Sequence, residues 1–229
     1  DHPQMSQVEL AQIRAGRERL TQNVGFGVWR QLIRNRDTLV LTGAYFAENY
    51  VFYLFFTWFF HYLVVELGFG ILETGFLASL PWLCGAVMAS LGGYTCDALC
   101  AKLGPRLGCR IPAITGLFCA GIFLHAGLYA NSPYIAVGLL SLCFASTQFT
   151  EGAFWSAQIY IAGPYTAPAS GVMNTGGNLA GIVVAPLMPY LAMHVGWVTA
   201  LSTGSVMALL GAFLWLFVRP DKPFTPDVA

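Results

Sequence analysis

Two carboxylates interrupt long apolar runs of the sequence and are candidates for proton chemistry. Glu48 lies eleven residues after Asp37, about 16 Å along a helix, and Glu151 lies past the middle of the apolar run 134–162. A charge near the middle of a bilayer costs at least about 2.5–3.5 kcal/mol. Burial favours the protonated acid, which suits a group that takes up and releases a proton. We interpret Glu48 and Glu151 as proton-coupling candidates; the alternative is that each is a neutral, hydrogen-bonded structural acid.

Polar side chains around Glu151 recur at helical spacing. Gln148, Glu151, Trp155 and Gln158 follow i, i+3, i+7, i+10, with Thr150 to the side. This spacing puts the four side chains on one face of a helix. We expect that face to look into a helix bundle or a water-filled cavity.

Two further runs carry polar groups beside small or aromatic residues. Asn174 and Asn178 are four residues apart, next to Gly177-x-x-x-Gly181. Small residues let membrane helices approach closely, so packing is the favoured interpretation of the glycines, while a cavity role and a packing role stay open for the asparagines. The aromatic-rich run 38–64 has a patch at cavity depth, which consists of Tyr45, Glu48, Asn49 and Phe52.

The six cysteines form no recognisable metal pattern in the sequence. Three fall inside apolar runs, whereas Cys96, Cys100 and Cys109 share one short connection. Their spacing matches no zinc motif and no histidine is close to them, so we expect free thiols, no metal and no cofactor.

The composition is that of a membrane protein. Only 10% of the 229 residues are Asp, Glu, Lys or Arg, against roughly 25% in soluble proteins, and 56% are hydrophobic. Such a chain cannot coat a water-facing surface, which excludes a soluble enzyme and a disordered linker. A net charge of zero gives no field that would recruit nucleic acid.

The apolar runs predict an all-α membrane protein, a six-transmembrane-helix bundle over residues 38–218. The hydrocarbon core needs about 20 helical residues, and helices satisfy their own backbone hydrogen bonds there. Six runs are long enough: 38–64, 73–95, 111–129, 134–162, 171–193 and 197–218.

The basic residues predict the orientation of this bundle. All eleven lie on the side that carries both termini, and the opposite connections, 65–72, 130–133 and 194–196, contain none. By the positive-inside rule both termini are cytoplasmic. Residues 1–37 are then a cytoplasmic linker with a short amphipathic helix, which begins at the capping-box spacing Ser6 to Glu9, and 219–229 are a cytoplasmic tail. Residues 26–36 suit an interfacial helix or a plain basic flank equally well.

The connection after the second run resembles a gating motif. Gly93-x-x-x-Asp97, followed by Arg106, is similar to the signature Gly-x-x-x-Asp-(Arg/Lys)-x-Gly-(Arg/Lys) of the major facilitator superfamily, with extra length before the basic residue. Glycines there permit close helix approach, and Asp97 and Arg106 can pair beside a cytoplasmic gate.

Longer runs resemble one family within that superfamily. The run Thr150 to Trp155 and the run Gly171 to Gly181 are similar to the anion:cation symporter family of sugar-acid and organic-anion transporters. The resemblance covers residues 1–220 and matches only the C-terminal six-helix half of such a transporter. The polar start of the chain, without a signal peptide, also reads like the middle of a longer protein.

The resemblance implies a function and a set of site residues. It implies proton-coupled symport of an organic anion, such as a sugar acid, across a bacterial inner membrane by alternating access. The missing N-terminal half would be supplied in cis or in trans, and it would bring the positive charge, because no Lys or Arg lies inside any predicted span. The substrate-binding residues that it implies are Asn49, Tyr50, Thr150, Trp155, Asn174 and Asn178.

A structural role is the alternative interpretation. The chain would then be a six-helix structural or interaction module, or a homodimeric carrier in which two copies form the pathway. An intramembrane enzyme is disfavoured because the sequence has no His-Glu-x-x-His motif and no nucleophile elbow.

Overall fold

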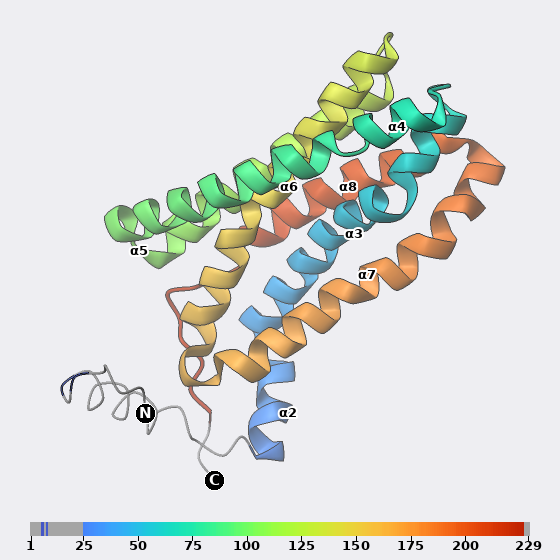
Figure 1. Cartoon of the computed structure of the whole chain (residues 1–229). Helices are drawn as coiled ribbons and strands as arrows, with labels where there is room; N and C mark the ends of the chain where they lie inside the picture. The colour runs from blue at the N-terminus through green and yellow to red at the C-terminus, as the bar shows by residue number, and fades with distance from the viewer. Residues whose placement is uncertain (1–5, 7, 9–24, 227–229) are drawn as a thin grey trace.

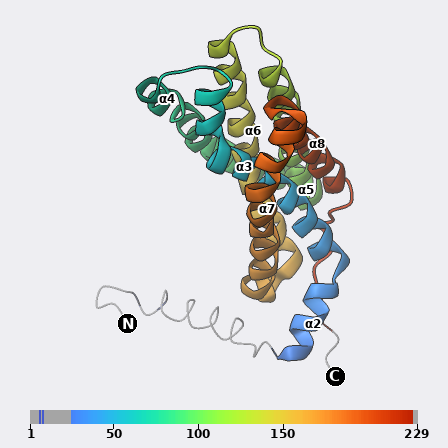
Figure 2. The ribbon, with the colours of Figure 1, turned by 90° about the vertical axis from the view of Figure 1, so that its right-hand side faces the viewer.

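A computed structural model describes residues 6, 8 and 25–226, and every regular element in this part of the chain is helical. The helices run alongside one another in an elongated bundle (Figures 1 and 2). They are α2 (Phe26–Arg34), α3 (Arg36–Val65), α4 (Ile71–Leu77), α5 (Leu80–Leu128), α6 (Pro133–Ala162), the 3₁₀ helix η1 (Gly163–Tyr165), α7 (Thr166–Val195) and α8 (Trp197–Trp215). The helix expected to begin at Ser6 lies mostly outside the described residues.

Four stretches of the described chain are long and apolar enough to cross a membrane. They are 36–65, 71–128, 133–195 and 197–215, and the second and third contain 58 and 63 residues. A single crossing needs about 20 residues. Because Gly104 interrupts α5 and η1 separates α6 from α7, each long stretch supplies two crossings. The all-α, six-helix membrane fold predicted from the apolar runs is therefore confirmed.

The predicted connection 96–110 is in fact a helical hairpin within α5. Gly104 has φ 79° and ψ 167°, a conformation that side chains with a Cβ rarely adopt, and it reverses the chain there. The two arms then touch so closely that a Cβ on Gly108 would overlap the backbone of Cys100. The charges that end the apolar run were interpreted as a loop, but Ala, Leu, Lys and Arg are good helix formers.

Charged side chains tie three segments together at one end of the bundle. The Asn35 side chain caps α3 by accepting a hydrogen bond from the Thr38 amide at 3.0 Å. Arg219, just after α8, donates to both carboxylate oxygens of Asp37 at 3.0 and 2.9 Å. The hydrogen bond to Asp37 raises the pKa of the Arg219 guanidinium. Arg110 of the hairpin donates to the Val218 carbonyl at 2.8 Å.

The expected pairing of Asp97 with Arg106 is wrong. Arg106 forms its ion pair with Asp221 of the C-terminal segment, at 3.9 Å, and Asp97 is exposed on the other arm of the hairpin. The helical hairpin sets this arrangement, because Asp97 lies on the arm before the Gly104 turn and Arg106 lies on the arm after it.

Neutralising Asp37 is expected to lower the unfolding temperature. The Asp37 carboxylate is 7% exposed and accepts two hydrogen bonds from the Arg219 guanidinium. Asp37→Asn therefore leaves this charged donor without its bidentate acceptor. Thermal unfolding in detergent measures the effect. Asp97→Asn, at an exposed position, is the control; the double variant Asp37→Asn with Arg219→Gln should lose less than the sum of the two single losses.

Candidate functional site

The site begins with three neighbouring residues in the middle of α3, the helix that packs against α6, α7 and α8. The Asn49 side-chain amide donates to Glu48 Oε2 and to the Tyr45 carbonyl, both at 3.0 Å. Glu48 is only 1% exposed, and its Oε1 is buried with no hydrogen-bond partner among the described residues. Leaving a buried oxygen without a hydrogen-bond partner costs free energy, so Glu48 Oε1 is a candidate to carry a proton.

α6 brings the second carboxylate to the same place. Trp155 Nε1 donates to Glu151 Oε2 at 2.9 Å, and the Trp155 and Tyr45 rings meet edge to face with centroids 6.2 Å apart. Tyr45 also interacts with the Glu151 carboxylate, which in turn interacts electrostatically with Glu48. The structure thus brings together the two acids that the sequence singled out.

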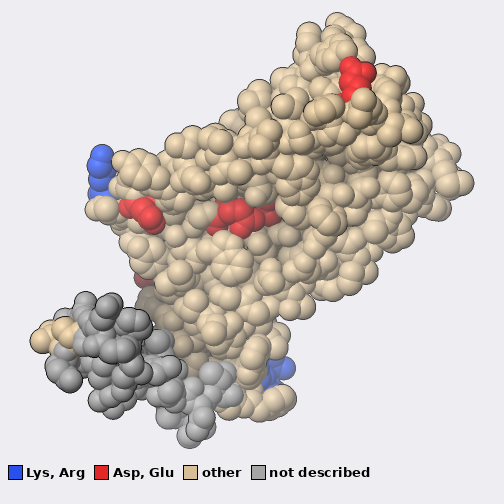
Figure 3. All heavy atoms as spheres, viewed as in Figure 1, with Lys and Arg blue, Asp and Glu red and all other residues tan. Residues whose placement is uncertain are grey.

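Glu151 is the more accessible of the two acids. It is partly exposed, whereas Glu48 is enclosed. Figure 3 shows acidic atoms near the middle of one face of the bundle, surrounded by uncharged atoms. A partly exposed acid in such a setting can exchange a proton with water while its partner stays shielded.

α7 closes the site through its glycines, as their spacing predicts. A Cβ on Gly177 would lie 2.6 Å from the Tyr45 ring and 2.9 Å from Asn49 Nδ2, and one on Gly181 would lie 2.8 Å from the Tyr53 ring. The packing interpretation of Gly177-x-x-x-Gly181 is therefore confirmed.

The asparagines of α7 lie on an exposed face next to these glycines. Asn178 accepts a hydrogen bond from the Tyr53 hydroxyl at 2.6 Å and donates to the Asn174 carbonyl at 2.7 Å. Sequence reasoning missed Tyr53 as a site residue. Its position four residues after Asn49, on the same helix face, was the available signal.

Two expected site residues point elsewhere. The Tyr50 hydroxyl is 2.9 Å from Thr203 Oγ1 on α8, and the residue is 2% exposed. Thr150 is fully buried and donates to the Thr147 carbonyl of its own helix. Each lies one residue from a site residue, which turns its side chain by about 100° around the helix axis. Neither hydroxyl reaches the Glu48–Glu151 region in this structure.

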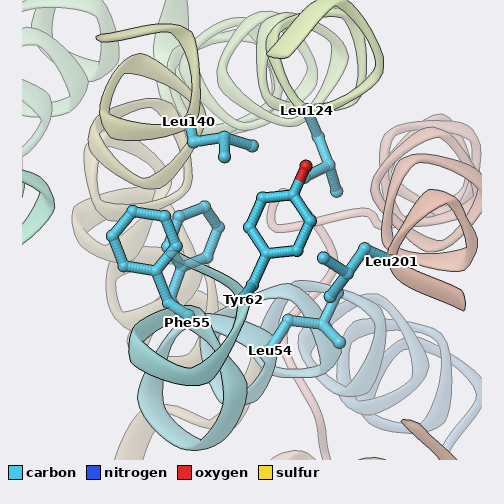
Figure 4. Close-up of a pocket in the computed structure, with 7 residues that line it drawn as sticks. Leu54, Phe55, Tyr62, Leu124, Leu140 and Leu201 are labelled. Atoms are coloured by element: carbon cyan, nitrogen blue, oxygen red, sulfur yellow. The ribbon is translucent and has the colours of Figure 1, made fainter. Parts of the chain in front are cut away.

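A small cavity lies away from this site, inside the apolar core (Figure 4). Its volume is about 10 Å³, enough for roughly one water molecule. Figure 4 shows the Tyr62 ring projecting between leucines of neighbouring helices. The lining consists of Leu54, Phe55, Phe59, Tyr62, Leu124, Leu140 and Leu201. The cavity is too small and too apolar to hold an organic acid.

The sequence is similar to those of several transporters. The chain is 32% identical over 213 residues to a probable galactarate/D-glucarate transporter of Bacillus subtilis, and 34% identical over 197 residues to one of Escherichia coli. It is 30% identical over 195 residues to a probable sulfoacetate transporter of Cupriavidus necator. These alignments cover 84–85% of the chain and 44–45% of each relative. No family model matches the chain.

The fold is also known from a solved structure. The fucose:proton symporter of E. coli superposes with a TM-score of 0.70 at 17% identity, over 87% of this chain and 47% of that one. The chain thus spans about half the length of the relatives that it matches. All of these relatives are transporters, so the expectation that the chain is not an enzyme is confirmed. The chain thus resembles about half of a sugar-acid or organic-anion transporter in sequence, and it has the fold of half of a major facilitator superfamily transporter.

Proposed function

We propose that the chain is the C-terminal half of a secondary active transporter that moves a sugar acid or a similar organic anion together with protons, by alternating access. The observation that carries the proposal is the pair Glu48, which is buried, and Glu151, which is partly exposed; Tyr45, Asn49 and Trp155 join them across two helices. Intramembrane acids that face a bundle interior are typical of proton relays in transporters. The names of the relatives supply the class of substrate.

The residues divide into two roles. Glu48 and Glu151 carry the proton, and neutral groups bind the hydroxyls and carboxylates of the substrate. Those groups are Asn49, Trp155, Asn174 and Asn178, which lie on α3, α6 and α7. Charge-neutral binding groups of this kind orient a polar substrate but do not neutralise an anion.

We further infer that the cation for the substrate comes from a second, N-terminal six-helix half. No Lys or Arg lies within the six predicted spans, and the basic residues gather at the end that carries α2 and the C-terminal segment. By the positive-inside rule this end faces the cytoplasm of an inner membrane. The partner half would complete the cavity from the opposite side, whether it belongs to the same polypeptide or to another.

Transport assays in proteoliposomes test the proposal. The chain reconstituted with its N-terminal half should take up labelled galactarate, glucarate or sulfoacetate when the proton gradient is imposed, and a protonophore should abolish the uptake. The chain alone should remain at the background of empty liposomes.

The assay tests each part of the proposal by a separate outcome. Uptake by the isolated chain would refute the need for a second half and favour a homodimeric carrier. Uptake that ignores the proton gradient would refute the coupling. Failure of the complete transporter to move any of the three acids would refute the substrate class.

A further inference from the structure

Three cysteines meet across the α5 hairpin, whose backbone Figure 1 shows in green. Cys96 and Cys100 lie on the arm before the Gly104 turn, and Cys109 lies on the arm after it. Their sulfur atoms form a nearly regular triangle with edges of 4.0, 4.0 and 3.7 Å. The spacing along the chain argues against a zinc motif, but the hairpin brings distant positions together in space.

The triangle has the dimensions of a metal–thiolate site. A point equidistant from the three sulfurs lies about 2.25 Å from each of them, close to a metal–sulfur bond of about 2.3 Å. A disulfide would need a sulfur–sulfur distance of about 2.05 Å, so each pair would have to close by more than 1.5 Å. The arrangement suits one ion shared by three sulfurs better than a bond between two.

The surroundings of the three sulfurs are suited to holding an ion. Cys96 and Cys109 are fully buried, and the partly exposed Cys100 leaves a route from solvent. The close contact of Gly108 with Cys100 fixes the separation of the two arms. Asp97, which follows Cys96, is the charged side chain that acts on Cys96 and Cys100, and its negative charge favours a bound cation.

We propose that Cys96, Cys100 and Cys109 bind a soft, thiophilic metal ion, for which Cu(I) is the best match. Thiolates select Cu(I), zinc and iron–sulfur clusters, whereas structural zinc takes four ligands and this cluster supplies three. Each thiol that binds releases its proton, and the ion then joins the two arms of the hairpin. The site is independent of the proposed transport function.

Anaerobic titration of the full chain in detergent with Cu(I), against a competing chelator, tests the site. We expect one tightly bound ion per chain and a metal–sulfur shell of three sulfurs at about 2.25 Å by X-ray absorption. Cys100→Ser should weaken binding by at least about 10-fold, because it removes a ligand rather than an outer-shell group. The control variant Cys84→Ala, Cys119→Ala, Cys143→Ala keeps the cluster and should bind as the unmodified chain does.

A second measurement uses the unmodified chain and needs no substitution among the three cysteines. Mass mapping of alkylated cysteines in the unmodified chain should show that one equivalent of Cu(I) protects the partly exposed Cys100 and leaves the labelling of Cys84 and Cys119, which are also partly exposed, unchanged. Absence of a bound ion, equal binding by Cys100→Ser, a two-sulfur shell, or protection of Cys84 or Cys119 would each overturn the proposal.

Discussion

Glu151→Gln is expected to reduce proton-driven uptake by the complete transporter by on the order of 100-fold, the low end of what loss of an essential proton-transfer group costs. Glutamine is neutral at every pH and keeps the acceptor oxygen for Trp155 Nε1, so the site's hydrogen bond survives while the titratable proton is lost. Exchange of labelled for unlabelled substrate moves no net proton and should persist. The measurement is the ratio of gradient-driven uptake to exchange.

Glu48→Gln should have the smaller effect of the two substitutions. Glu48 is almost fully enclosed, whereas Glu151 is partly exposed and has the direct route to water. Asn49 Nδ2 can still donate to the new side chain at position 48. Glu73→Gln on α4, an acid outside the site that accepts a hydrogen bond from Tyr134, is the matched control and should transport normally. Unchanged, proton-dependent uptake by both site variants would refute the role of the pair.

The sequence predicted the acids of the site but not the directions of their neighbours. Glu48 and Glu151 were found because a carboxylate in an apolar run is costly, and that reason holds whatever the packing. Tyr50 and Thr150 could not be placed, because a rotation of one residue around a helix separates a cavity-facing hydroxyl from one that faces a neighbouring helix. Periodicity gives relative directions on one helix and leaves the absolute direction to tertiary packing.

Contacts between distant segments could not be predicted from the sequence, for a related reason. Apolar length predicts a helix at 134–162, and α6 runs from Pro133 to Ala162. The Asp37–Arg219 pair and the triangle of cysteines depend on how helix ends meet across the bundle. The turn at Gly104 brings the three cysteines together, and the positive φ of Gly104 is known only from the folded chain.

Gly92→Ala is expected to destabilise the bundle by about 3 kcal/mol, the upper end of the usual cost of overpacking. A Cβ on Gly92 would overlap the carbonyl group of Phe149 on α6, and a helix backbone cannot rotate aside as a side chain can. The two helices would have to separate. Thermal unfolding in detergent, monitored by helical circular dichroism, measures the loss.

The neighbouring glycine provides the control for this substitution. A Cβ on Gly93 would meet no atom within 4 Å, so Gly93→Ala should be neutral or more stable by up to about 1 kcal/mol, the gain in helix propensity. Both substitutions bring the same propensity gain, so their difference isolates the clash. Equal unfolding temperatures would contradict the close α5–α6 crossing.

The same crossing connects the gating motif to the candidate site. A Cβ on Gly152 would lie 2.7 Å from the Gly93 Cα, so Gly152 and Phe149 fix α6 against α5 on both sides of Glu151 in the sequence. A change in the angle between the two helices would therefore displace the Glu151 carboxylate from Tyr45 on α3. We expect Gly92→Ala to lose gradient-driven uptake even at temperatures where it remains folded, and Gly93→Ala to retain it. Folded Gly92→Ala that transports normally would show that Glu151 does not depend on this crossing.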